Sequence, residues 1–221
     1  MRGHFITFEG GEGSGKSTHA AGLAQRLQAI GIKAVLTREP GGSTGAEIIR
    51  HVLLSGIAKP LGPETEAILF AAARDDHVRT VILPALNAGQ WVICDRFIDS
   101  TRVYQGVLGQ VDPRLIRSLE RVTVGPAVPD LTFILDVPAK VGMARATSRR
   151  GADAADRFEA ETIDYHEKLR EAYRALAKLE PARCIVVDGR APRDVVAQRI
   201  WTAVENNLMP GQAREAEVAS P

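Results

Sequence analysis

The sequence predicts an α/β fold, in which a doubly wound, five-stranded parallel sheet carries helices on both faces. Short runs rich in β-branched and aromatic residues alternate with longer segments of helical pattern along the 221 residues. The strand-like runs are mostly continuous rather than alternating, as in strands that are covered on both faces. We expect right-handed crossovers and a single domain over residues 1–208, followed by a flexible tail over 209–221.

The individual elements follow from these patterns in chain order. Strands are expected at residues 4–8, 33–37, 91–94, 131–136 and 183–188. Helices are expected at about residues 15–30, 44–55, 64–88, 112–122, 138–148, 159–179 and 192–207. The run from Ala67 to Ala73 is apolar nearly all round, so its helix should be covered on several sides. Residues 148–158 are small, charged and aperiodic, which predicts a mobile loop that serves as a small lid.

The overall composition excludes several classes of protein. The 28 basic residues nearly balance the 27 acidic ones, so no global field favours nucleic acid or a membrane surface. No apolar run approaches the length of a membrane span, and the N-terminus lacks the pattern of a signal peptide. Cys94 and Cys184 lie in apolar runs and predict buried, reduced thiols in a cytoplasmic protein. The five histidines lack ligand-like spacing, and we expect them at the surface or locally bonded.

A glycine-rich stretch follows the first expected strand directly. The spacing Gly10-x4-Gly15-Lys16-Ser17 matches the P-loop pattern, with a strand before it and a helix after it. Glycines let consecutive backbone N–H groups point at phosphate oxygens, and the helix N-terminus adds partial positive charge. Lys16 would reach the β- and γ-phosphates, and the Ser17 hydroxyl would ligate Mg²⁺. The predicted triphosphate site comprises Gly10, Gly11, Glu12, Gly13, Ser14, Gly15, Lys16, Ser17 and Thr18.

A P-loop needs a second strand that ends in an acid near the metal, and two candidates compete. Asp95 follows the strand-like run WVIC, and Asp136 follows LTFIL. Asp95 precedes Arg96, so this strand end carries a metal-attracting and a phosphate-attracting group together. Asp136 precedes Val137 and a proline that suits the first turn of a helix, so a turn or cap explains it. We therefore predict Asp95 as the metal residue beside Ser17.

Three further segments are rich in arginine and small residues. They are TREPGG at residues 37–42, FAAAR at 70–74, and the combination DRF…ST…YQG over 95–106. Together with the P-loop, this set resembles the motifs of thymidylate kinases, and the resemblance covers about residues 3–205. It implies a P-loop kinase fold that uses Mg²⁺, binds ATP and dTMP, transfers the γ-phosphoryl group to dTMP, and commonly forms homodimers.

The expected acceptor site combines charge and shape. Arg38 and Arg96 follow neighbouring strands at the sheet edge where ligands bind, and the resemblance assigns both to the dTMP phosphate. Surface ion pairs with Glu39 or Asp95 would explain either arginine alone. Phe70 and Arg74 share one helix face, and the resemblance implies stacking on thymine and a bond to its carbonyl edge. It further implies that Ser100 contacts the base, Tyr104 excludes a 2′-hydroxyl and Glu12 holds the 3′-hydroxyl. The predicted acceptor residues are Glu12, Arg38, Phe70, Arg74, Arg96, Ser100, Tyr104 and Gln105.

Phosphoryl transfer also needs positive charge on the migrating group. Because the P-loop carries Glu12-Gly13-Ser14 rather than a basic residue, the chain resembles thymidylate kinases that supply an arginine from the lid. The candidates are Arg149 first, Arg157 second, and Arg150. The resemblance also implies that Arg145 stacks on adenine, with the loop at Arg190 on the other side.

Two rival functions lead to different expectations. A kinase for another nucleoside monophosphate would keep this mechanism, whereas a deoxynucleoside kinase would not need Arg38 and Arg96 around an acceptor phosphate. An ATP-driven switch or a nucleic-acid-binding ATPase would predict a basic face, and would leave Phe70, Arg74 and Tyr104 without a purpose.

Overall fold

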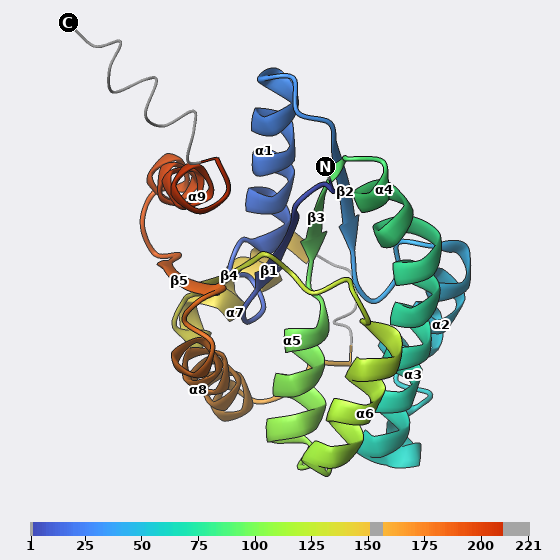
Figure 1. The fold of residues 1–221 in the computed structure, drawn as a ribbon. Coiled ribbons are helices and arrows are strands. Elements are labelled where there is room, and N and C mark those ends of the chain that lie inside the picture. Colours follow the sequence, from blue (N-terminus) through green and yellow to red (C-terminus); the bar gives the residue numbers. More distant parts are fainter. Residues whose placement is uncertain (1, 151–156, 210–221) are drawn as a thin grey trace, which may run out of the picture.

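A single parallel sheet forms the centre of the protein, and the computed structural model describes residues 2–150 and 157–209. The strand order is β2-β3-β1-β4-β5, and every neighbouring pair is parallel. Helices cover both faces (Figure 1), which confirms the predicted doubly wound α/β fold. The strands are β1 (Phe5–Glu9), β2 (Ala34–Arg38), β3 (Trp91–Asp95), β4 (Leu131–Asp136) and β5 (Cys184–Asp188).

Helices connect the strands, and two of them, α6 and α8, begin at a side-chain cap. Asp112 accepts a hydrogen bond from the backbone N–H of Arg114 at 2.7 Å, and Thr162 accepts one from that of Tyr165 at 3.2 Å. The cap at Thr162 explains why the eighth helix begins later than the predicted residue 159. The helices are α1 (Lys16–Ala29), α2 (Thr44–Leu54), α3 (Gly62–His77), α4 (Leu83–Asn87), α5 (Ile98–Thr101), α6 (Pro113–Thr123), α7 (Ala139–Arg150), α8 (Ile163–Leu179) and α9 (Arg193–Leu208).

Two expectations about helices were wrong in detail. The helix predicted at 64–88 is interrupted by a π-helical segment, Val78–Ile82, just before Pro84, which has no N–H to donate to the preceding turn. The run from Ala67 to Ala73 is covered on several sides, as predicted, since Ala67, Ala71 and Ala73 are buried and only its outer side, with Ile68 48% exposed, is open. No helix was predicted between β3 and residue 112, yet α5 and a second π-helical segment, Arg102–Leu108, occupy that connection.

The apolar core lies on both faces of the sheet. One face packs against α1 and α9, as Figure 1 shows, with Phe8, Phe133 and Trp201 in this layer. The other face packs against α3, α4, α5 and α8. The edge strands β2 and β5 depart from the expectation of full cover, because Leu36 and Val186 remain nearly half exposed.

The remaining composition-based expectations have mixed outcomes. Both cysteines are buried and unpaired, as predicted. No helix within the described ranges is long and apolar enough to cross a membrane. The histidine expectation was wrong for His166, which is buried in α8, whereas His77 is buried but bonded to its neighbours.

Every strand ends in a charged residue at one edge of the sheet. The register aligns Phe8 with Asp95 and Arg38 with the same Asp95, so the ends of β1, β2 and β3 lie side by side. Ligands bind at this edge in open parallel sheets. The fold therefore gathers the charged ends of three strands around the beginning of α1.

Candidate active site

The P-loop joins β1 to α1 through glycines in conformations that other residues rarely adopt. Gly10, Gly13 and Gly15 have φ values of 131°, 63° and 98°. The ammonium group of Lys16 turns back over the loop and donates to the carbonyl oxygens of Gly10 at 3.0 Å and Gly11 at 2.8 Å. Burial, and next the neighbouring Arg96 guanidinium, lower the pKa of Lys16. A phosphate would offer this lysine a stronger partner than two neutral carbonyls.

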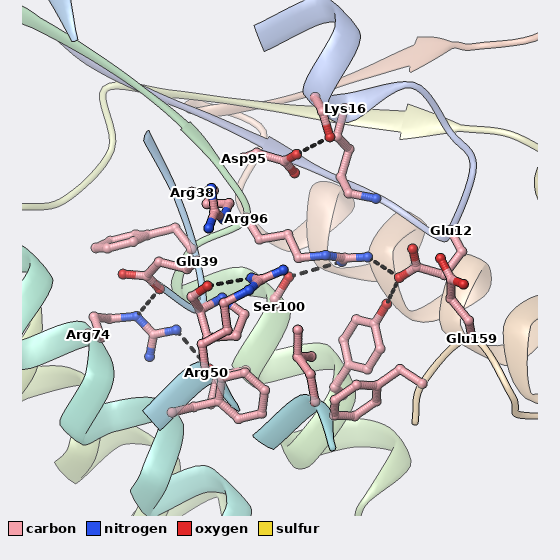
Figure 2. A pocket seen from close by; sticks show the side chains of 18 of the residues that line it. Glu12, Lys16, Arg38, Glu39, Arg50, Arg74, Asp95, Arg96, Ser100 and Glu159 are labelled. Atoms are coloured by element: carbon pink, nitrogen blue, oxygen red, sulfur yellow. Dashed lines mark hydrogen bonds and ion pairs between the residues drawn. The ribbon is translucent and has the colours of Figure 1, made fainter. Parts of the chain in front are cut away.

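Asp95 lies beside Lys16, as Figure 2 shows, and forms an oxygen pair with Ser17. The Ser17 hydroxyl donates to Asp95 Oδ2, and Asp95 Oδ1 is buried without a hydrogen-bond partner among the described residues. Asp136, the competing candidate, is held by Arg170, whose Nε lies 2.5 Å from its Oδ1. An unpartnered buried carboxylate oxygen next to a hydroxyl is chemically suited to Mg²⁺, which takes one or two protein ligands together with phosphate oxygens. Asp95 and Ser17 thus fit the predicted metal position, and Asp136 does not.

The expected adenine side lies across the P-loop from this pair. A Cβ atom on Gly13 would overlap the carbonyl of Gly142, so the P-loop packs directly on the backbone of α7. Arg145 on α7 donates to the carbonyl of Gly189 at 3.0 Å. The structure therefore brings Arg145 and the loop after β5 together. Arg190 in that loop pairs with Asp188 at the strand end, at 2.9 Å.

Arg96 lies at the centre of the expected acceptor side. Its backbone is left-handed, with φ of 66°, immediately after β3. Its guanidinium pairs with Glu12 and donates to Ser100 Oγ at 3.3 Å (Figure 2). It also lies 5.2 Å from the ring of Tyr104. Burial alone would raise the pKa of Glu12, but Arg96 and then Lys16 outweigh it and lower this pKa to about 2. The Glu12 carboxylate therefore stays ionised, between the P-loop and Arg96, at any physiological pH.

Arg38 approaches the same space from β2. Its Nη2 atom lies 2.9 Å from Glu47 Oε1 on α2, and the backbone N–H of Gly42 donates to that same oxygen. Among the residues that the structure describes, the side chain of Arg38 pairs with Glu47 rather than with Glu39 or Asp95, the partners considered from the sequence. The arginine remains half exposed and lines a cavity that extends from the P-loop to α3.

Aromatic side chains close the other end of the cavity. Phe70 lines it from α3, with its ring 6.1 Å from that of Phe158. Tyr104 contacts Phe158 edge-on at 5.4 Å and donates to Glu12 at 3.3 Å. Arg74 lines the cavity although only 2% of it is exposed. The cavity, of about 230 Å³, is thus charged beside the P-loop and aromatic at its far end.

Comparisons with known proteins agree with this geometry. The family profile described as thymidylate kinase matches residues 8–200. A thymidylate kinase from Nitrobacter winogradskyi is 61% identical over 213 residues, which cover 96% of this chain and 93% of that protein. Another from Bradyrhizobium diazoefficiens is 58% identical, covering 98% and 95% of the two chains. The crystal structure of thymidylate kinase from Ehrlichia chaffeensis superposes with a TM-score of 0.73 at 33% identity, covering 92% of this chain and 99% of that one. The chain belongs to the thymidylate kinase family. The resemblance found in the motifs is confirmed.

The predicted lid of this thymidylate kinase family member lies partly outside the described residues, because 151–156 are not described. The expectation of a loop from residue 148 was wrong at its start, because α7 continues to Arg150. Arg149 lines the cavity and lies 3.6 Å from Glu159. Arg157 instead pairs with Glu66 on α3 at 2.8 Å and is not among the residues that line the cavity. The structure therefore separates the first two lid candidates, and describes no side chain for Arg150.

Several residues of the site were not found from the sequence. Phe158 is the last residue of the predicted lid, where an isolated aromatic residue gave no periodic signal. Glu39 lies inside the TREPGG motif but was considered only as a surface partner for Arg38, whereas it is buried. Gln105, by contrast, was predicted as an acceptor residue, and the structure places it, buried, in the lining of the cavity with a hydrogen bond to Glu66. Glu9 was not predicted, yet its carboxylate accepts the backbone N–H of Phe97 at 2.8 Å and so fixes the start of α5.

Proposed function

We propose that the protein transfers the γ-phosphoryl group of ATP to dTMP, giving ADP and dTDP. The observation that carries this proposal is one continuous cavity that joins a P-loop to a second set of arginines and aromatic residues. A P-loop alone suits any triphosphate-using protein. The additional cationic and aromatic subsites suit a nucleoside monophosphate in line with the triphosphate.

On the donor side, backbone N–H groups of the P-loop would hold the phosphates of ATP, and Lys16 would move from the loop carbonyls onto them. Ser17 and Asp95 would hold Mg²⁺, which neutralises phosphate charge when it is bound. Arg145 and the Gly189–Arg190 turn would flank the adenine. The adenine role is supported by the hydrogen bond from Arg145 to the Gly189 carbonyl at 3.0 Å.

On the acceptor side, we assign the monophosphate to Arg96 and Arg38, because guanidinium groups bind two phosphate oxygens at once. Phe70 would stack on thymine while Arg74 bonds its carbonyl edge. Tyr104 would exclude a 2′-hydroxyl, and Glu12 would accept from the 3′-hydroxyl. The phosphate of dTMP is ionised near neutral pH, so the reaction needs positioning and charge rather than a strong base.

The proposal extends to the assembly and location of the protein. We propose a homodimer, since α2 and α3 pack together and carry the exposed apolar residues Ile48 and Ile68. A cytoplasmic location suits two buried, unpaired cysteines.

The deciding experiment measures ADP release with Mg-ATP and a panel of dTMP, dUMP, UMP, CMP, dGMP, AMP and thymidine. We expect strong preference for dTMP, little turnover of UMP and none of thymidine, and loss of activity in Lys16→Met. Turnover of a different monophosphate would overturn the base assignment while keeping the mechanism. ADP release that ignores the acceptor would mean an ATPase and would refute the proposal.

A further inference from the structure

A chain of hydrogen bonds links β2 to α3 beneath the aromatic end of the cavity. Arg74 donates from Nε to Glu39 Oε2 at 2.8 Å, and from Nη2 to Thr101 Oγ1 at 3.0 Å. His77 Nδ1 lies 3.1 Å from Glu39 Oε1, and its Nε2 lies 2.7 Å from Thr37 Oγ1. The two oxygens of one carboxylate are thus used by two different residues of α3.

The burial of this group sets it apart from the surface ion pairs of the protein. Glu39, Arg74 and His77 all lie in the buried interior, where a charge without a partner is costly. Glu39 and Arg74 nevertheless line the cavity, as Figure 2 shows for both. His77 is fully covered and cannot touch a ligand itself. Its bond to Glu39 therefore acts on the ligand through Glu39 and Arg74.

The same turn of α3 also holds the loop that follows Arg38. A Cβ atom on Gly42 would lie 2.5 Å from both His77 Nε2 and Thr37 Oγ1, so the loop passes directly over that hydrogen bond. Asp76 caps the start of α2, accepting from Ser43 Oγ at 2.7 Å and from the backbone N–H of Gly45 at 3.1 Å. The base side and the phosphate side of the acceptor site are therefore attached to one another through α3.

We propose that His77 and Glu39 are positioning residues that set the orientation of the Arg74 guanidinium, and through it the base preference of the enzyme. This proposal rests on the proposed function. A guanidinium is planar, so bonds at Nε and Nη2 fix the direction of its remaining donors. The Glu39 carboxylate can rotate if only one oxygen is held. His77 holds the second oxygen and so fixes the carboxylate, which in turn fixes the plane of Arg74.

Two substitutions of His77 separate its two bonds. The amide nitrogen of Asn lies close to the position of imidazole Nδ1, and the amide of Gln reaches the position of Nε2. His77→Asn should keep the bond to Glu39 and lose the bond to Thr37, and His77→Gln should do the reverse. We expect His77→Gln to lower the ratio of kcat/KM for dTMP over dCMP by about tenfold, the worth of one well-aligned hydrogen bond, while His77→Asn stays within about twofold of wild type.

dCMP is the informative competitor because it carries an amino group where thymine presents a carbonyl to a guanidinium donor. KM for ATP should not change in either variant. His51, an exposed histidine on α2, provides the matched control, and His51→Asn and His51→Gln should leave the ratio unchanged. If His77→Gln and His77→Asn lower the melting temperature alike and leave the ratio at the wild-type value, His77 is only structural and the proposal is overturned.

A second measurement does not depend on the acceptor. The Nε–H of Arg74 should give a ¹H–¹⁵N resonance that exchanges slowly with solvent in the ligand-free protein, assigned by its loss in Arg74→Lys. We expect slow exchange to persist in His77→Asn and to be lost in His77→Gln. If exchange is equally slow in both, Glu39 does not need His77 and the positioning role is refuted. If the wild-type enzyme does not prefer dTMP, the proposed function fails, and the proposed effect of His77 on base preference fails with it. If the wild-type enzyme prefers dTMP and the His77 variants keep the same preference, only the inference about His77 is refuted.

Discussion

The arginines proposed to bind phosphate or base each have a carboxylate partner in the structure. A phosphate that enters the cavity must therefore compete with an acid for the guanidinium. The competition is uneven, because Glu12 is largely buried with Arg96 whereas Glu47 is exposed beside Arg38. Exposed pairs contribute at most about 1 kcal/mol, so Arg38 is released more easily than Arg96. We infer that Arg96 is a preformed part of the acceptor site, and that Arg38 changes partner when dTMP binds.

The two lid arginines provide the prediction at the scale of residues. Arg149 is 63% exposed and lies 3.6 Å from its partner, whereas Arg157 is 16% exposed, pairs with Glu66 at 2.8 Å and lies 4.3 Å from the ring of Phe158. Arg149→Ala should lower kcat by about 100-fold or more, as for loss of a transition-state donor, with little change in melting temperature. Arg157→Ala should leave Glu66 without its charge partner and cost about 1–3 kcal/mol of stability, with a smaller loss of kcat. Steady-state kinetics and thermal melts of both variants test this, and the opposite assignment of the two effects would contradict it.

At the scale of elements, the contact between the P-loop and α7 depends on two glycines. A Cβ atom on Gly142 would overlap the carbonyl of Glu12, so the P-loop or the helix must move if one is added. Gly142→Ala should raise KM for ATP several-fold and lower the free energy of unfolding by about 1–3 kcal/mol, the usual cost of overpacking.

Gly22 on α1 supplies the matched control for this substitution. A Cβ atom there meets nothing within 4 Å, so Gly22→Ala should stabilise the protein by up to about 1 kcal/mol and leave KM for ATP unchanged. Urea unfolding and ATP titration of the two variants measure both quantities. A Gly142→Ala protein with wild-type KM and stability would show that the close contact is unimportant.

An element could be predicted from the sequence where the interactions that form it involve residues close together in the chain. The five strands are continuous apolar runs, and the P-loop is a contiguous motif, so both follow from neighbouring residues. The short helix α5 could not be predicted, because its first turn is fixed by Glu9, which accepts from Phe97 and Ser100 about 90 residues along the chain. The site residues likewise divide into those that belong to one sequence motif and those that meet only in the folded chain. Arg96 and Asp95 belong to one motif, whereas the pairing of Arg157 with Glu66 joins segments that only the folded chain brings together.

At the scale of the whole molecule, the proposed homodimer gives the last prediction. Ile48 on α2 is 69% exposed and Ile68 on α3 is 48% exposed, and the two helices pack against each other. Neither side chain lines the cavity, so their exposure has no explanation in substrate binding. Burial of such residues between two copies would stabilise an assembly of twice the 23.8 kDa of the chain.

The double substitution Ile48→Glu with Ile68→Glu should therefore convert the dimer to a monomer, because two carboxylates would lose water in each half of the interface. Leu179→Glu is the control, since Leu179 is 82% exposed at the end of α8, a helix that Figure 1 shows apart from α2 and α3. Sedimentation velocity at several concentrations distinguishes the two masses. A wild-type chain that stays monomeric at every concentration would refute the proposed dimer. A double variant that still sediments as a dimer would show that the contact between the two copies lies elsewhere.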